Sequence, residues 1–337
     1  MRSNLAPALA ALVVAGALTA CTSPPEPDAT ATPTATAAPS PTATTEVRLV
    51  GAGEKPPVVF GGDCAAALTP ADIREVTGVE LASAASESRG DLGNVGGLLC
   101  SWEATEGTAV RLEILPRAGL GDTRFPADQV GYYFEECDAQ WVCAGVAESD
   151  DIWIGASFQS FPGADRAQID EWTASLTSSV FENLRARGSE VWTRDRSGWW
   201  TALDCTALAA TMSGELGTPM TGEAGGYHDP PPPGGLLAAT VSNRSGCYLY
   251  DGGNRFEVNA VAGQAWMLPT NADDPPFDTG VPGVTAWLDS SFQSVAAAGY
   301  TMTDGVNALS AVVSTTAPWS AEDAVRALAR GAASDWG

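Results

Sequence analysis

The chain of 337 residues has few cationic side chains and few of the residue types that usually perform catalysis. It contains one histidine, His228, and one lysine, Lys55. The 41 acidic residues outnumber the 17 Lys and Arg residues and give a net charge of −24. One histidine excludes histidine-rich zinc sites and would leave any Ser-His-Asp triad dependent on that residue. The acidic balance argues against nucleic acid as a partner, because phosphate backbones are bound through Lys and Arg.

Several catalytic and metal-binding motifs are also missing. No Gly-x-Ser-x-Gly turn accompanies His228, and the sequence has no Walker phosphate loop and no Ser-x-x-Lys. The acidic segments 148–151 and 271–274 lack the spacing of a calcium-binding EF-hand loop. We therefore expect no enzymatic activity, no cofactor and no metal. A hydrolase that uses two carboxylates is the least favoured alternative.

Long hydrophobic runs are absent after the N-terminal segment, so the sequence predicts no membrane-spanning helix. The N-terminal segment carries Arg2, an apolar stretch from Leu5 to Leu18, and the sequence Leu18-Thr19-Ala20-Cys21. This pattern resembles a bacterial lipoprotein signal, in which residues 1–20 are removed and the thiol of Cys21 receives a diacylglyceryl group. It predicts an extracytoplasmic protein that two acyl chains hold at the outer face of the cytoplasmic membrane.

Residues 21–46 are rich in Thr, Pro, Ala and Ser. They cannot bury enough apolar surface to fold, so we expect the lipidated Cys21 to be followed by a disordered stalk. The remaining chain divides into two halves, 47–190 and 191–337, that resemble each other. Segments 153–160 and 287–294 share five of eight residues, and Asp63-Cys64 matches Asp204-Cys205. We interpret the halves as a duplicated domain.

The cysteines support this interpretation. Six of the seven remain when Cys21 is set aside, and an even number outside the cytoplasm predicts disulfides. The repeat selects Cys64–Cys100 and Cys205–Cys247 as equivalent bridges. It leaves Cys137 and Cys143 to close a small loop in the first half.

Local patterns predict an α+β fold used twice, with an antiparallel sheet in each half and helices packed on one face of it. Thr69-Pro70-Ala71-Asp72 and Ser320-Ala321-Glu322-Asp323 are typical helix starts. Val110, Leu112 and Ile114 alternate with polar residues as in a half-buried strand. Strands are also expected at 98–103, 152–160, 286–294 and 306–313, an amphipathic helix at 169–184, and a loop at 225–233.

Tryptophan is the residue type in evident excess, with 11 copies, all after the stalk. On the two repeated strands one face carries Trp, Ser and Gln, and such a face could hold a ligand by stacking and hydrogen bonding. The candidate ligand-binding residues are Trp153, Ser157, Gln159, Trp287, Ser291 and Gln293. The alternative is that each tryptophan packs beneath the terminal helix of its own half.

The combination of features resembles a group of actinobacterial cell-envelope lipoproteins of uncharacterised function. The matching residues are Asp63, Cys64 and Leu68, followed by Cys100 and Trp102. In the second half, Asp204, Cys205 and Leu208 match, but Leu249 stands where the pattern has tryptophan. The resemblance implies architecture and location, not an activity. We expect a module that binds an envelope ligand or partner; the alternative is a structural accessory subunit of an envelope complex.

Overall fold

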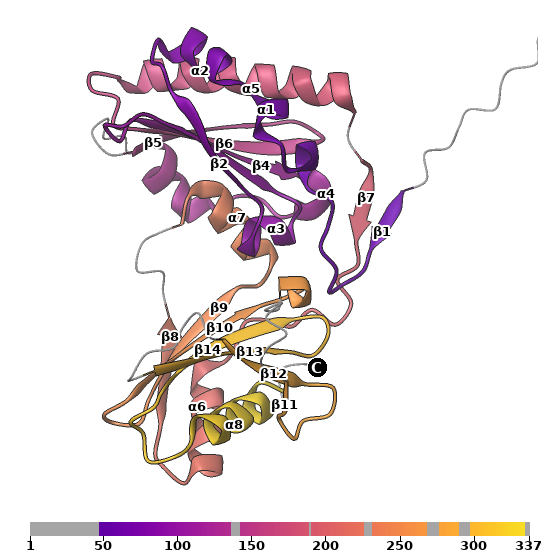
Figure 1. Cartoon of the computed structure of the whole chain (residues 1–337), viewed down its shortest axis with the longest axis vertical. Coiled ribbons are helices and arrows are strands. Elements are labelled where there is room, and N and C mark those ends of the chain that lie inside the picture. The colour runs from indigo at the N-terminus through magenta and orange to yellow at the C-terminus, as the bar shows by residue number, and fades with distance from the viewer. Residues whose placement is uncertain are drawn as a thin grey trace, which may run out of the picture. The chain divides into compact units, whose positions relative to one another are not determined.

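The structure is a computed structural model that describes residues 47–135, 142–188, 190–225, 231–267, 276–289 and 297–333 (Figure 1). These residues lie in one compact unit, Thr45–Gly337. Within the described ranges, no helix has both the length and the apolar character needed to cross a membrane.

The first half folds into a five-stranded antiparallel sheet with the order β2-β3-β4-β6-β5 (Figure 1). Its strands are β2 Ala82–Glu87, β3 Leu98–Glu103, β4 Ala109–Pro116, β5 Val142–Glu148 and β6 Ile152–Gln159. Its helices are α1 Cys64–Ala67, α2 Pro70–Thr77, α3 Gly90–Asn94, α4 Arg117–Leu120 and α5 Arg166–Arg187.

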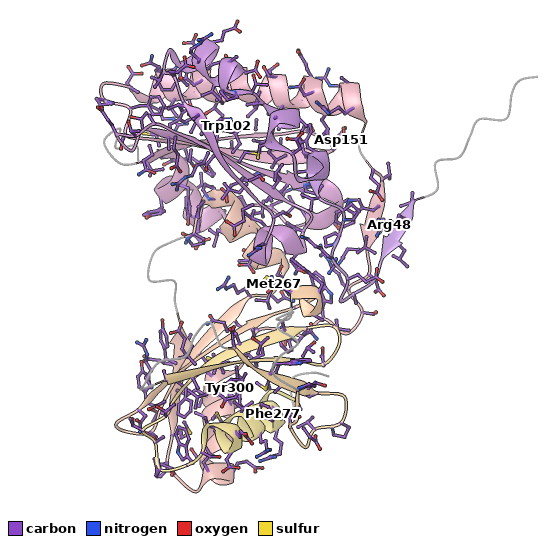
Figure 2. The ribbon with its side chains drawn as sticks, viewed as in Figure 1. Arg48, Trp102, Asp151, Met267, Phe277 and Tyr300 are labelled. Atoms are coloured by element: carbon purple, nitrogen blue, oxygen red, sulfur yellow. A yellow bond between two sulfur atoms is a disulfide. The ribbon has the colours of Figure 1, made fainter. Side chains whose placement is uncertain are left out.

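The core of this half lies between the sheet and α5. The alternating residues Val110, Leu112 and Ile114 of β4 are fully buried there, as the sequence predicts. The strand is not half-buried as expected, because Glu113 on its other face is 2% exposed beneath the helix at 233–241. Trp102 of β3 belongs to the same core and is fully buried (Figure 2). The predicted capping box is present at the start of α2, where Thr69 and Asp72 bond to each other's backbone N–H groups.

The second half folds into a seven-stranded antiparallel sheet with the order β11-β12-β13-β14-β10-β9-β8. Its strands are β8 Thr221–Gly225, β9 Ser245–Tyr250, β10 Arg255–Val261, β11 Phe277–Asp278, β12 Thr285–Asp289, β13 Ala297–Thr303 and β14 Ala308–Ser314. Its helices are α6 Cys205–Leu216, α7 Pro233–Val241 and α8 Ala321–Ala333. Helices α6 and α8 pack on one face of the sheet around a core that includes Tyr300, so the predicted α+β class is confirmed (Figure 2).

Both predicted equivalent disulfides are present. Cys64–Cys100 has a Cα–Cα distance of 5.6 Å and Cys205–Cys247 one of 5.4 Å. Each bridge ties the first residue of a helix to a strand. Cys143 is also disulfide-bonded, and its expected partner Cys137 lies outside the described residues.

Local details repeat along with the bridges. The carboxylate of Asp63 accepts a hydrogen bond from the N–H of Ala65, and that of Asp204 accepts one from Thr206, so each aspartate caps the helix that follows. Before the strand that carries the second cysteine of each bridge, the chain takes a left-handed conformation, at Gly96 (φ 72°) and at Asn243 (φ 46°). The two halves therefore share these local backbone features as well as the sequence motifs.

One predicted correspondence is wrong. The described part of the second similar segment, residues 287–289, does not occupy the place in its sheet that residues 153–160 occupy in the first. Strand β6 lies between β4 and β5 and leads into α5, whereas β12 lies between β11 and β13. The strand equivalent to β6 is β14, which lies between β10 and β13 and leads into α8. The second half has the additional pair β11 and β12, and a local motif does not reveal such an insertion.

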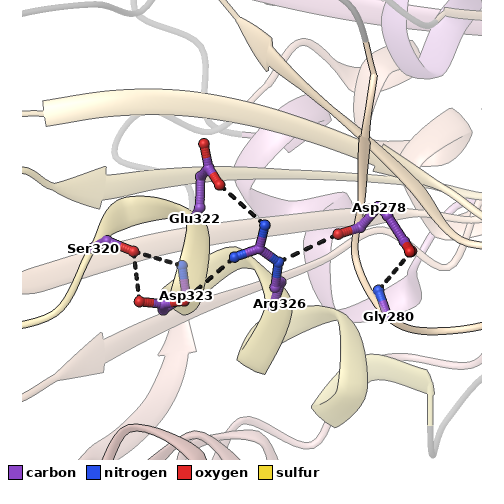
Figure 3. Close-up of polar contacts among 6 residues, drawn as sticks. All are labelled: Asp278, Gly280, Ser320, Glu322, Asp323 and Arg326. Atoms are coloured by element: carbon purple, nitrogen blue, oxygen red, sulfur yellow. Dashed lines mark hydrogen bonds and ion pairs between the residues drawn. The ribbon is translucent and has the colours of Figure 1, made fainter.

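Arg326 of α8 binds the end of β11, one strand of this additional pair. The guanidinium of Arg326 donates to the backbone oxygen of Asp278 at 3.3 Å and to the carboxylates of Glu322 and Asp323 at 3.0 and 3.3 Å (Figure 3). Ser320 caps α8, as predicted, by accepting from the N–H of Asp323 at 3.1 Å (Figure 3). The end of β11 is thus held at the start of the last helix.

Contacts between residues of the two halves include a buried polar cluster. Asn94 of α3 is 1% exposed, and its amide donates to Ser242 Oγ at 2.9 Å and to the backbone oxygen of Ala262 at 2.8 Å. Its Oδ1 accepts from the indole N–H of Trp266 at 3.1 Å. The first segments of the two halves also pair, as the parallel strands β1 Arg48–Val50 and β7 Trp192–Arg194.

Candidate ligand-binding pocket

The sequence-predicted site in the first half is filled by the protein itself. Trp153 and Ser157 lie on the face of β6 opposite the main core and are 3% and 9% exposed. Leu237 and Val241 of α7 pack against Trp153, and the ring of Phe125 stacks on it at 6.3 Å. Gln159, at the end of β6, is half-buried. Trp153 therefore packs beneath a helix, but the helix is α7 and not the terminal helix α5.

A buried carboxylate fixes α7 in this position. Glu113 of β4 is 2% exposed and accepts hydrogen bonds from the N–H groups of Gly234 and Gly235, at 2.7 and 2.8 Å. These are two of the free donors at the N-terminus of α7, where the helix dipole also favours a negative charge. Burial raises the pKa of Glu113 from 4.5 to about 7, although the two N–H donors and the charge of Arg111 act in the opposite direction.

The predicted site in the second half is described in part. Trp287 is half-buried on β12, and its register neighbours across the sheet are Thr301 of β13 and then Ser310 of β14. Ser291 and Gln293 lie outside the described residues. The ligand-binding role of the Trp, Ser and Gln face stays a prediction.

A cavity of about 510 Å³ lies elsewhere in the chain, within the first half and the segment that follows it. Four segments line it, namely 57–61, 116–118, 150–152 and residues between 184 and 192. We call it the Arg117 pocket. Its size is typical of small-molecule sites, and most of its lining side chains are apolar. Ile152, Leu184 and Trp192 supply buried apolar surface at 1%, 6% and 4% exposure.

One wall of the Arg117 pocket has an unusual backbone. Phe60, Gly61 and Gly62 all take positive φ angles, of 54°, 63° and 82°. Glycine adopts this conformation freely, whereas in Phe60 it costs about 1 kcal/mol or more. Such strain persists where the surroundings enforce it, and here it shapes a wall of the cavity.

Charged residues of both signs line the same pocket. Arg117 and Arg187 contribute two cations, and Asp150, Asp151 and Glu190 contribute three carboxylates. The carboxylate-bearing residues are all exposed, and Asp151 is labelled in Figure 2. In contrast, only 17% of the Arg117 side chain is exposed.

Sequence analysis did not select this pocket, because its four segments are distant in the chain and none carries a recognisable motif. The one local signal is the Phe60-Gly61-Gly62 sequence. Among the described residues, no group of three or more His, Cys, Asp or Glu side chains could hold a metal ion. His228 and the acidic segment 271–274 lie outside the described residues.

Comparison of the chain with protein-family models, curated proteins and solved structures finds no match. The two described disulfides fit a domain stabilised by cysteine pairs, of the kind that persists in an oxidising compartment.

Proposed function

We propose that the chain is a lipid-anchored extracytoplasmic protein of the cell envelope that binds a small amphipathic ligand in the Arg117 pocket. The observation that carries the proposal is the pocket itself, a cavity of about 510 Å³ with apolar walls and a few charged groups. The lipoprotein-like segment ending at Cys21, the stalk and the disulfides support the location.

The carboxylate with a raised pKa does not favour the hydrolase alternative. A catalytic acid needs access to a substrate, whereas both oxygens of Glu113 accept hydrogen bonds from the N-terminus of α7. Glu113 therefore serves the packing of α7, and binding remains the better supported class of function.

A screen for ligands of the full chain tests the binding proposal. A ligand at 100 times its dissociation constant adds about 2.7 kcal/mol to stability, which a thermal-shift assay detects. The variant Ala118→Trp fills the pocket, and Ala118→Val is its matched control. We expect amphipathic compounds to raise the melting temperature of the unmodified chain and of A118V but not of A118W. Hits that stabilise a folded A118W equally would place the site elsewhere.

The anchor is tested separately. The variant Cys21→Ala removes the thiol that would carry the diacylglyceryl group, so we expect it to be released to the medium or left unprocessed. Fractionation of cells that express each form measures this. Processed C21A protein that stays in the membrane fraction would contradict the lipid anchor.

The second candidate function, an accessory subunit of an envelope complex, is favoured by one surface. Val47, Leu49 and Val191 lie at strands β1 and β7 and are 49%, 66% and 47% exposed. Exposed apolar side chains that lie together are a feature of protein contacts. Crosslinking in intact cells distinguishes the two functions, because a subunit would be captured with one partner through this surface.

A further inference from the structure

We propose that the ligand of the Arg117 pocket is an amphipathic carboxylate, whose anionic end pairs with Arg117 and whose apolar body lies against the pocket walls. This inference rests on the proposed function and specifies the class of ligand.

The first argument is that the charge of Arg117 is poorly compensated. Its guanidinium makes no hydrogen bond to any described residue, and Nη1 is buried without an acceptor. The nearest carboxylate oxygen, Oε2 of Glu148, is 3.8 Å from Nη1, which is beyond hydrogen-bond distance. Only 17% of the Arg117 side chain is exposed, so water replaces few of the missing contacts. A buried cation without a hydrogen-bonded anion is costly, and a carboxylate would satisfy it.

The second argument is the difference between Arg117 and the carboxylates around it. Glu190 is paired with Arg48 at 3.1 Å, and both side chains are about half exposed. Asp150 and Asp151 are exposed to water as well. Charges in water attract a ligand weakly, whereas a charge removed from water attracts one strongly. Arg117 is therefore the group that decides the sign of the ligand's charge.

The third argument concerns the rest of the ligand. The apolar lining side chains that water still reaches are Val58 and Phe60, which are half-buried, and Val191, which is 47% exposed. A small inorganic anion would leave these surfaces in contact with water. A ligand with an apolar body would bury them, at about 25 cal/mol for each Å². The combination of one buried cation and apolar walls selects an amphipathic anion.

The test titrates the full-length protein with three compounds that share a ten-carbon chain, by isothermal titration calorimetry. Each compound is used below its solubility limit, and the two ionic ones are also kept below their critical micelle concentrations. Decanoate carries the carboxylate, decylammonium carries a positive charge, and decanol is neutral. We expect decanoate to bind with one site per chain and at least tenfold more tightly than the other two.

Variants show whether Arg117 is the group that pairs with the charged end of the ligand. Arg117→Gln should weaken decanoate binding at least tenfold and leave decanol binding unchanged. Glu148→Gln removes the competing carboxylate and should strengthen decanoate binding two- to threefold, an effect that a merely structural role of Arg117 would not produce. Arg117→Lys keeps the charge and covers the case in which R117Q does not fold. Arg74→Gln is the matched control, because Arg74 pairs with Glu80 outside the pocket.

The outcomes separate the inference from the proposed function. If decanol or decylammonium binds as tightly as decanoate, or if R117Q binds decanoate normally, the charge inference is wrong and the pocket is still a binding site. If decanoate does not bind at all, the inference is wrong too. The proposed function fails only if the wider ligand screen also finds no compound that the pocket-filling variant excludes.

Discussion

The sheets of the two halves differ in how their two faces are covered. In the first half, α5 covers one face, and α7, which comes from the second half, covers the other, where Trp153 and Glu113 lie. In the second half, α6 and α8 cover one face, and Trp287 on the other face is half-buried. The two similar halves thus present different surfaces, because a helix of the second half packs on the sheet of the first. Trp153 and Trp287 therefore have different surroundings.

The disulfides give the largest expected effect and the one that should be equal in the two halves. The bridges span 36 and 42 residues, and loops of this length restrict the unfolded chain by about 4 kcal/mol each. The double variants C64S/C100S and C205S/C247S should therefore lose similar amounts of unfolding free energy, measured by urea denaturation. A loss below about 1 kcal/mol for either pair would show that the bridges are not equivalent supports.

Tryptophan truncation should separate the halves. Trp153→Ala removes a ring that is 97% buried between α7 and Phe125, and such changes cost about 3 to 5 kcal/mol. Trp287→Ala removes a half-buried ring and should cost about 1 kcal/mol. Denaturant titration of both variants measures the difference. Equal losses would contradict the different packing of the two faces.

Glu113 should make the stability depend on pH. Its pKa is about 7 in the folded chain and 4.5 in the unfolded chain, so the folded state binds its proton more tightly. The stability that this proton contributes, about 3 kcal/mol, is present below pH 4.5 and is lost as the pH rises to 7.

The check is the unfolding free energy of the unmodified chain and of Glu113→Gln between pH 4.5 and 7.5. The unmodified chain should lose more stability than E113Q over this interval, while Glu257→Gln on β10 should follow the unmodified chain. Parallel curves for E113Q and the unmodified chain would show that Glu113 titrates normally.

Much of the fold could be predicted because the signals are local. Thr69 and Ser320 cap helices through residues three positions away, and the alternation of Val110, Leu112 and Ile114 depends on one strand. The repeat predicts the two described disulfides, since equivalent cysteines occur in the same order in both halves.

The contacts of α7 could not be predicted in this way. The run of prolines before it indicates a loop, yet Pro233 is the first residue of the helix, a position that tolerates proline because no intrahelical N–H is needed there. Its capping partner, Glu113, is 121 residues from Gly234. The Arg117 pocket could not be predicted for the same reason. Its lining residues come from segments that are distant in the sequence and lie together only in the folded chain.

The most direct test of the account is hydrogen–deuterium exchange of the full chain, with and without the strongest ligand from the stability screen. The account predicts slower exchange in segments 57–61 and 116–118, which line the Arg117 pocket, and little change in β12 and β13. Protection confined to β12 and β13, or no protection in the pocket segments, would contradict the pocket and favour the face that carries Trp287.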